Sequence, residues 1–404
     1  MIIYAAKNFI FILLEITLAK MKKMNFLIAP ASFKECLNAN QIAKIIKDAI
    51  LSVFPDAFIK VIPMADGGEG TVETLINAQN GTFKYIEVHD PLLRKTTARF
   101  GIINENKTAI IEMAAASGIE LISKSERNPL ITSTYGTGEL ITAALDLGCR
   151  KIILGIGGSA TNDAGVGALM ALGVRFYDKK DHLLKNIGGN LSLIHRFENS
   201  LLDSRLSESE IIIACDVNNP LTGTEGASLV YSPQKGADLK TARKLDDHLK
   251  YFAALIRQSK GIDIEGIPGA GAAGGLGGGL LAFTNCKLVP GFEIVKEITQ
   301  LEKYIEWADI IFTGEGQIDF MTKFGKTPAG IARIAKKYNK PVIAIAGSLG
   351  ENYQELYEDG FKAIYPINDN PITIEESIRR APELIYTTVV NIANTIKADS
   401  KICN

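Results

Sequence analysis

The stretch "GIGGSATNDAGVGALMALG", Gly155–Gly173, decides how this chain folds, because it joins a strand-like run to a helix-like one. The segment "KIILGI" predicts a buried strand, and "AGVGALMALG" predicts a helix that ends at Gly173. Between them, "GGSATND" is a turn rich in glycine and in hydrogen-bonding side chains. Glycine permits positive φ and the close approach of a ligand, and backbone N–H groups at a helix start attract anions. The turn therefore predicts a phosphate-binding cradle.

The same turn has two other interpretations. Its glycines could serve only a tight turn and a close helix crossing, with Asn162 or Asp163 capping the helix. Alternatively, Gly155, Gly157 and Ala160 match the dinucleotide pattern G-x-G-x-x-A, and Asp178 follows at the spacing of a ribose-binding acid. A nicotinamide-dependent oxidoreductase acting on a small hydroxy acid is therefore an alternative function. Against it, the carboxylate of Asp163 would repel a pyrophosphate unless Mg²⁺ lay between them, and a metal favours phosphoryl transfer.

The rest of the chain alternates between strand-like and helix-like segments. We predict a strand at 25–29, a helix at 40–54 and a strand at 58–63, and the rhythm returns late in "WADIIFTGEG", "TPAGIARIAKKY" and "PVIAIAGS". The segment "TFKYIEVHDPLLRKTTARFGIINENKTAIIEMA" between them predicts antiparallel strands. We therefore expect an α/β protein with a discontinuous parallel-sheet domain (24–70 and 288–400), an inserted α/β domain (71–287) and a leader (1–23) outside the fold.

Composition excludes several classes of function. The 404 residues carry a formal net charge of −1 and no basic stripe, so we expect no nucleic-acid partner. The first apolar run is broken by Lys7 and Glu15 and is too short to span a bilayer, so we expect no membrane association. The five cysteines are scattered and lack CxxC spacing, which indicates a reducing compartment, and we expect the cytoplasm.

Three further clusters are consistent with phosphate chemistry. "PMADGGEGT" (63–71) follows a predicted strand, and "TGEGQIDFMTKFGKTPAG" (313–330) places two acidic residues at a strand end and a lysine just before a helix. "GIPGAGAAGGLGGGL" (266–280) is too rich in glycine for a plain helix, so we predict a wall of backbone that a ligand approaches closely.

Together these motifs resemble those of the bacterial glycerate kinase family, of the glycerate 2-kinase type. The resemblance runs in order through "IAPASFKECLNA", "PMADGGEGTVETL", "IEMAAASGIELI", "STYGTGEL", "GIGGSATNDAGVG", "ACDVNNPLTG", "QKGA", "PGAGAAGGLGGGL" and "GEGQIDFMTKFGKTP", from about residue 24 to about residue 346. It implies a Rossmann-like or flavodoxin-like discontinuous domain with an inserted α/β domain, and a site in the cleft. It also implies ATP-dependent phosphorylation of D-glycerate, with 2-phosphoglycerate the favoured product and 3-phosphoglycerate the alternative. ATP, Mg²⁺ and D-glycerate are the expected ligands, and a homodimer is compatible with the resemblance.

Phosphoryl transfer needs positioned substrates, neutralised phosphoryl charge and a proton acceptor, and these needs select the candidate site residues. The candidate catalytic residues are Asp66, Asp319, Lys326 and Lys34. The candidate substrate- or nucleotide-binding residues are Ser32, Gly67, Gly68, Glu69, Glu112, Ser117, Gly157, Gly158, Ser159, Thr161, Asn162, Gly274, Gly275 and Glu315. The candidate metal ligands are Asp163 and Asp216, because Mg²⁺ takes one or two carboxylates beside phosphate oxygens.

The chain departs from the family pattern at two positions. Ala31 stands where the family usually has aspartate in "APDSFK", and Met321 stands where it usually has glutamine. A non-catalytic relative that binds glycerate and nucleotide is therefore a second alternative function.

Overall fold

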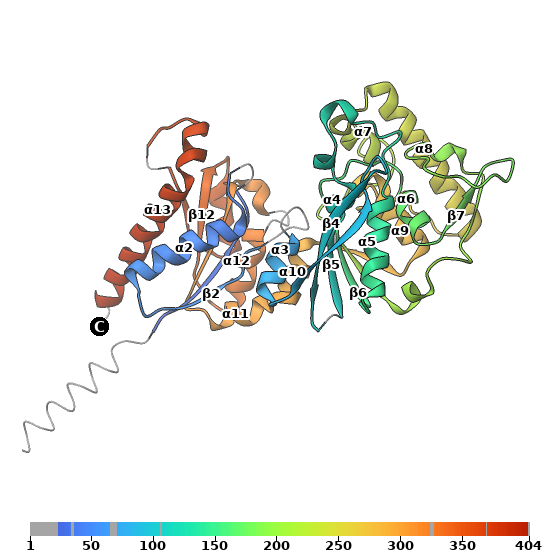
Figure 1. Cartoon of the computed structure of the whole chain (residues 1–404). Coiled ribbons are helices and arrows are strands. Elements are labelled where there is room, and N and C mark those ends of the chain that lie inside the picture. The colour runs from blue at the N-terminus through green and yellow to red at the C-terminus, as the bar shows by residue number, and fades with distance from the viewer. Residues whose placement is uncertain are drawn as a thin grey trace, which may run out of the picture. The chain divides into compact units, whose positions relative to one another are not determined.

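The computed structural model describes residues 23–33, 36–64, 71–105, 107–323, 327–368 and 370–402. The chain divides into two compact units, of which the first comprises Met1–Pro63 with Leu301–Asn404 and the second comprises Met64–Gln300 (Figure 1). The second unit is thus inserted into the sequence of the first. None of the helices in the described ranges is long and apolar enough to cross a membrane.

The first unit contains a five-stranded sheet in which every pair of neighbours is parallel. Its order is β13 (Phe361–Pro366), β12 (Val342–Leu349), β11 (Ile310–Ile318), β1 (Asn25–Pro30) and β2 (Phe58–Val61). The strands predicted at 25–29 and 58–63 and in the two late segments are confirmed. Because β1 leads to β2 on one side and β11 leads to β12 on the other, the strand order reverses between β1 and β11.

Helices in the first unit bury their apolar faces on this sheet. α2 (Ala39–Val53) begins with a capping box between Asn38 and Gln41, and its buried Ile42, Ile46 and Ile50 share a core with Phe26 and Ile28 of β1. α13 (Ile374–Ile402) lies beside α2 (Figure 1), while α11 (Leu301–Trp307) contacts β1 and α12 (Thr327–Lys337) contacts β11 and β12. The predicted helix at 40–54 is confirmed.

The second unit contains a six-stranded mixed sheet. Its order is β10 (Cys286–Val289), β9 (Glu210–Ala214), β6 (Lys151–Gly155), β5 (Thr108–Glu112), β4 (Lys95–Ile103) and β3 (Thr82–His89). β3, β4 and β5 pair antiparallel as predicted, and β5, β6, β9 and β10 pair parallel. The boundary that we expected between 287 and 288 runs through β10, which pairs with β9, so the second unit continues to Gln300. The boundary that we expected between 70 and 71 lies between Pro63 and Met64 instead.

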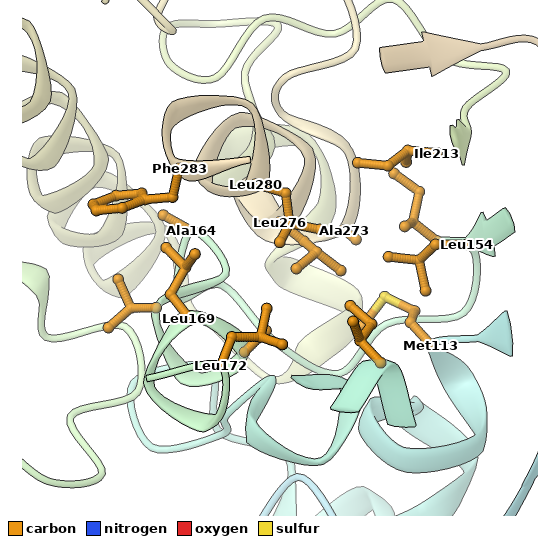
Figure 2. Close-up of a cluster of buried hydrophobic side chains, with 14 of the residues drawn as sticks. Met113, Leu154, Ala164, Leu169, Leu172, Ile213, Ala273, Leu276, Leu280 and Phe283 are labelled. Carbon is orange, nitrogen blue, oxygen red and sulfur yellow. The ribbon is translucent and has the colours of Figure 1, made fainter. Parts of the chain in front are cut away.

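Eight α-helices are described in the second unit. They are α3 (Thr71–Ala78), α4 (Ala114–Ser117), α5 (Tyr135–Asp146), α6 (Val166–Ala171), α7 (Ala227–Tyr231), α8 (Leu239–Lys260), α9 (Ala272–Phe283) and α10 (Gly291–Thr299). Figure 2 shows how Leu276 and Leu280 of α9 gather with Leu169 and the strand residues Leu154 and Ile213 in one buried cluster. This core holds the strand ends and the turns that follow them.

The glycine-rich segment 266–280 forms α9 and the turn before it, and φ is positive at Ala273, Gly274 and Gly275. A Cβ at Gly274 would lie 2.1 Å from the carbonyl oxygen of Thr161, and one at Gly279 would lie 1.8 Å from that of Ala164. Both glycines are buried. The close approach that we predicted for a ligand is thus made here to the protein's own backbone. These contacts by themselves explain why glycine stands at 274 and 275. A ligand-binding role for Gly274 and Gly275 stays a prediction.

Candidate functional site

Three parallel strands of the second unit end in segments that carry predicted site residues. β5 ends at Glu112, β6 ends at Gly155 before the 156–163 turn, and Asp216 comes two residues after β9. Since β5, β6 and β9 are parallel neighbours, their carboxyl ends lie along one edge of the sheet. Ligands of α/β folds commonly bind at such an edge.

The turn between β6 and α6 is exposed at its start and buried at its end. Gly157 and Gly158 are exposed, whereas Ser159, Thr161 and Asn162 are buried. Gly158 has φ +71°, as expected of a glycine that shapes a turn. The backbone N–H of Ala160 donates to the carbonyl oxygen of Ser117 at 2.9 Å, which fixes the turn to α4. The exposed glycines are therefore the part of the turn that a ligand from solvent meets first.

Asp163 is saturated by hydrogen bonds from the protein. Its Oδ2 accepts from the N–H and hydroxyl of Thr134, both at 2.8 Å, and from the N–H of Gly167 at 3.2 Å. Its Oδ1 accepts from the N–H of Gly165 at 3.1 Å. Burial raises the pKa of the Asp163 carboxyl, and these hydrogen bonds oppose that rise. Because an ionised carboxylate accepts about four hydrogen bonds, Asp163 does not fit the metal-ligand role that we predicted, and it anchors the start of α6 instead.

Lys235 is the charged residue of this site that our sequence analysis missed. It ends the 3-10 turn Pro233–Lys235, is 2% exposed, and its Nζ donates to Ser159 Oγ at 2.7 Å and to the carbonyl oxygen of Thr161 at 2.6 Å. Burial lowers the pKa of Lys235 to about 7, and the charge of Asp163 opposes that fall. The signal was present in "QKGA", since Lys235, like Lys34 and Lys326, stands in a motif rather than on a helix face.

The structure around the turn does not match a dinucleotide-binding unit. A dinucleotide-binding unit continues from strand to helix to a parallel strand of the same sheet. Here β7 (Arg175–Tyr177) pairs antiparallel with β8 (Arg196–Glu198) in a separate two-stranded sheet. Asp178 instead closes an exposed turn by accepting from the backbone N–H groups of Lys180 and His182.

Three other predicted residues of the second unit have contacts within the protein. Glu112 accepts from the N–H of Val72 at 3.0 Å, which holds the start of α3 to the end of β5. The fully buried hydroxyl of Ser117 pairs with that of Thr137 at 2.7 Å. Asn162 donates to Ser228 Oγ at 3.1 Å. These contacts give each residue a structural role, and their roles in substrate binding stay predictions.

In the first unit, Ser32 follows β1 and Asp319 follows β11, while Glu315 lies in the carboxyl-terminal half of β11. The strand order reverses between these two strands. The buried hydroxyl of Thr322 donates to Glu315 at 2.6 Å and accepts from the N–H of Asp319 at 3.2 Å. Thr322 thus joins the carboxylate of Glu315 to the backbone of Asp319, and our sequence analysis gave Thr322 no role. Such a reversal point is the usual ligand site of a doubly wound sheet.

The two departures from the family pattern lie beside these residues. Met321 is 58% exposed, so the substitution adds an apolar side chain at the surface. The N–H of Ala31 donates to the carbonyl oxygen of Gly314 at 2.8 Å, a contact that does not involve the side chain. Six predicted residues lie outside the described ranges, namely Lys34, Asp66, Gly67, Gly68, Glu69 and Lys326.

Within the described ranges, no three His, Cys, Asp or Glu side chains come together as a metal site. Asp216, the other predicted metal ligand, is exposed, and its Oδ1 accepts from the N–H of Gly291 at 2.9 Å. Mg²⁺ bound with a nucleotide takes most of its ligands from phosphates and water, so it needs only one or two protein carboxylates. Asp216 is accessible enough for such a contact, whereas Asp163 is not.

Fold and site together define a two-unit α/β protein whose parallel strands end in polar, glycine-rich turns suited to small anionic ligands. Comparison with known proteins gives the family: the sequence model described as the glycerate kinase family matches residues 26–397. The chain belongs to the glycerate kinase family, and it is therefore placed among phosphotransferases that use a nucleotide and a small-molecule acceptor.

Individual relatives match over nearly their whole length. A glycerate kinase of Halalkalibacterium halodurans is 46% identical over 366 residues, which cover 91% of this chain and 96% of the relative. The glycerate 2-kinase of Escherichia coli K12 is 44% identical over 373 residues, 92% of this chain and 98% of the relative. The solved structure of a provisionally named glycerate kinase 2 from Salmonella typhimurium LT2 superimposes with a TM-score of 0.84 at 44% identity, covering 94% of this chain and 100% of the other.

Proposed function

We propose that this protein transfers the γ-phosphoryl group of ATP to D-glycerate, with 2-phosphoglycerate as the product and ADP released. The observation that carries the proposal is the match to named glycerate kinases at 44–47% identity over almost the entire chain. In the reaction a hydroxyl oxygen of glycerate bonds to the γ-phosphorus, the bond to the β-phosphate oxygen breaks, and the hydroxyl proton passes to a base.

Residues at two strand edges support this proposal. In the second unit, the Gly157–Thr161 turn offers backbone N–H groups and hydroxyls, which suit an anionic group. In the first unit, the Glu315 carboxylate accepts from the Thr322 hydroxyl, and the backbone N–H of Asp319 donates to the same hydroxyl. Either carboxylate suits proton acceptance. When bound with ATP, Mg²⁺ would neutralise phosphate charge, and Asp216 is the described residue that we assign to it.

A coupled assay tests the proposal directly. The purified chain is mixed with ATP, Mg²⁺ and D-glycerate, and enolase is added without phosphoglycerate mutase. Formation of phosphoenolpyruvate, followed by its ultraviolet absorbance, is the expected result, since enolase accepts only the 2-isomer. Phosphoenolpyruvate that forms only after mutase is added would identify 3-phosphoglycerate. ADP release that does not depend on glycerate would contradict the proposal, and binding of both substrates without turnover would identify the non-catalytic relative.

A pair of glycine substitutions tests whether the turn contacts substrate. Gly158 and Gly223 both have positive φ, at +71° and +93°, so alanine at either should cost about 1–2 kcal/mol of stability. We expect Gly158→Ala alone to raise the KM for ATP or for glycerate, by roughly tenfold, because Gly158 lies in the exposed part of the turn. A Cβ at Gly158 would lie 3.3 Å from Ala114 Cβ, and one at Gly223 would meet nothing within 4 Å. Equal KM values in the two variants would remove the turn from the site.

We also propose a cytoplasmic location. The described cysteines Cys36, Cys149, Cys215 and Cys286 are free thiols, as expected in a reducing compartment. The predicted homodimer stays a prediction.

A further inference from the structure

Three buried polar atoms that have no hydrogen-bond partner among the described residues border the segment that carries Lys235. They are Thr161 Oγ1, Ser232 Oγ and Arg127 Nε. Lys235 donates to the backbone of Thr161, its own N–H donates to the carbonyl oxygen of Ser232, and the Arg127 guanidinium donates to the carbonyl oxygen of Gln234 at 3.4 Å. An unpaired buried polar group is costly, so such a concentration points to a missing partner.

The missing partner must match a site that is rich in donors. Lys235 Nζ can donate three hydrogen bonds, and described residues accept two of them. Thr161 is 0% exposed, and its hydroxyl supplies another donor. Asp163, the carboxylate whose charge acts on Lys235, has its oxygens occupied by backbone and hydroxyl donors. Among the described residues, a cation would find no group of three carboxylate, histidine or cysteine ligands, whereas an oxyanion would find a lysine and a hydroxyl here.

The anion is therefore expected at the Gly157–Ser159 end of the turn and not at the N-terminus of α6. At the start of α6, the N–H groups of Gly165 and Gly167 already donate to Asp163, so a negative group of the protein occupies the helix N-terminus. The other end of the same turn is exposed at Gly157 and Gly158 and leads to Ser159, which Lys235 contacts. An anion that approaches from solvent therefore meets the turn on the side of Lys235.

We propose that Lys235, Thr161 and Ser159 form a binding site for an oxyanion of the substrates, either the carboxylate of the hydroxy acid or a phosphate of the nucleotide. This inference rests on the proposed function and adds to it the residues that bind the charge. Lys235 supplies the positive charge, and Ser159 accepts a hydrogen bond from it and so holds the ammonium group against the turn. Thr161 donates a hydrogen bond that no described residue accepts.

Thr161→Val is the sharpest test, because it removes a hydroxyl that has no hydrogen-bond partner among the described residues while it keeps the shape of the side chain. Binding of sulfate, of ADP and of D-glycerate, each alone, is measured by calorimetry on the full chain. We expect an affinity loss of about fivefold or more for at least one probe, with an unchanged or higher melting temperature. A loss confined to D-glycerate identifies the carboxylate, and a loss confined to ADP and sulfate identifies the phosphate.

Lys235→Met tests the charge, and Lys240→Met, an exposed lysine five residues away, is the matched control. Sulfate does not change its charge between pH 6 and pH 8.5, so the pH dependence of its binding reports on the protein. Asp163 is the charged group that acts on Lys235, and we expect wild-type affinity for sulfate to fall by roughly tenfold across this range as Lys235 loses its proton. The control should show the same fall, and Lys235→Met should bind weakly and without it.

These experiments test the oxyanion site separately from the proposed kinase activity. If the wild type phosphorylates glycerate but both variants bind all three probes as the wild type does, the oxyanion site is wrong and the kinase stands. The oxyanion site is equally wrong if no probe binds to the wild type, or if sulfate affinity is independent of pH. If the wild type fails to turn over glycerate, sulfate binding to the wild type and the variants still decides the site.

Discussion

Asp163 and Lys235 lie against the same turn, and burial acts on their charges in opposite directions. Burial raises the pKa of Asp163 and lowers that of Lys235, because both groups lose solvation when charged. Hydrogen bonds to the Asp163 carboxylate oppose its shift, and the charge of Asp163 opposes that of Lys235. The ionisation of each residue is therefore linked to the stability of the second unit.

We expect Asp163→Asn to destabilise the second unit by about 2 kcal/mol or more, because an amide nitrogen would face N–H and hydroxyl donors that the carboxylate now accepts. Urea denaturation measures the effect. Asp247→Asn, an exposed position on α8, is the control and should change stability by less than about 0.5 kcal/mol. A variant of normal stability whose activity recovers with added Mg²⁺ would instead restore the metal-ligand role.

Lys235 should make stability depend on pH in a predictable direction. Its pKa is about 7 in the folded protein and near 10.4 when unfolded, so between these values the unfolded chain binds more protons. The free energy of unfolding should therefore rise with pH above 7, by up to about 1.4 kcal/mol per pH unit relative to Lys235→Met. Urea denaturation at pH 7, 8 and 9 measures the difference, and parallel curves for the two proteins would contradict the low pKa.

Among the elements, α9 shows most clearly how glycine is used. Its glycines let the helix and the turn before it lie directly on the backbone of residues 161–165, and the N–H of Ala164 donates to the carbonyl oxygen of Gly274 at 3.0 Å. The helix thus packs against the backbone of the polar turn. The turn's shape depends on this contact as much as on its own sequence.

Gly279→Ala should destabilise the protein by about 1–3 kcal/mol, because the new Cβ would lie 1.8 Å from the carbonyl oxygen of Ala164 and backbone must move to admit it. Gly266→Ala is the matched control, since a Cβ there meets nothing within 4 Å. Thermal unfolding of the two variants measures the difference. Equal melting temperatures would show that α9 does not pack as tightly as described.

For the whole molecule, the two units have separate cores. The core of the second unit includes Leu140, Leu154 and Leu280, and that of the first includes Phe26, Ile46 and Leu384. The second unit is one continuous segment, whereas the first is formed from two distant parts of the chain. A unit with its own core and continuous sequence has what independent folding requires.

We therefore expect residues 64–300 to fold alone and to unfold cooperatively, as followed by circular dichroism and urea denaturation. Within this fragment, Leu140→Ala should lower stability by about 2–5 kcal/mol, because Leu140 is fully buried. In the full chain, Ile46→Ala should weaken only the transition of the first unit. A fragment that stays unfolded in native buffer would show that the second unit depends on the first.

Much of the fold could be predicted from local pattern. Helical spacing of isoleucines in α2, apolar runs in β1 and β12, and alternation in β3 and β4 were each sufficient to predict the element. These signals are local, since they reflect which face of a helix or strand is buried. The boundary near residue 287 was wrong because the pairing of β10 with β9 joins residues 75 positions apart, such as Cys286 and Ile211.

The sequence by itself determined the order of elements, the glycine-rich turn after β6 and the family to which its motifs point. Only the tertiary structure decided which charges meet there, because contacts such as Lys235 with Ser159 join residues 76 positions apart. Burial then assigned the roles: Asp163, surrounded by donors, became an anchor, and Lys235, held beside unpaired hydroxyls, became the candidate for binding an anion. Hydrogen-bond saturation and desolvation depend on every neighbouring segment, and no local pattern encodes them.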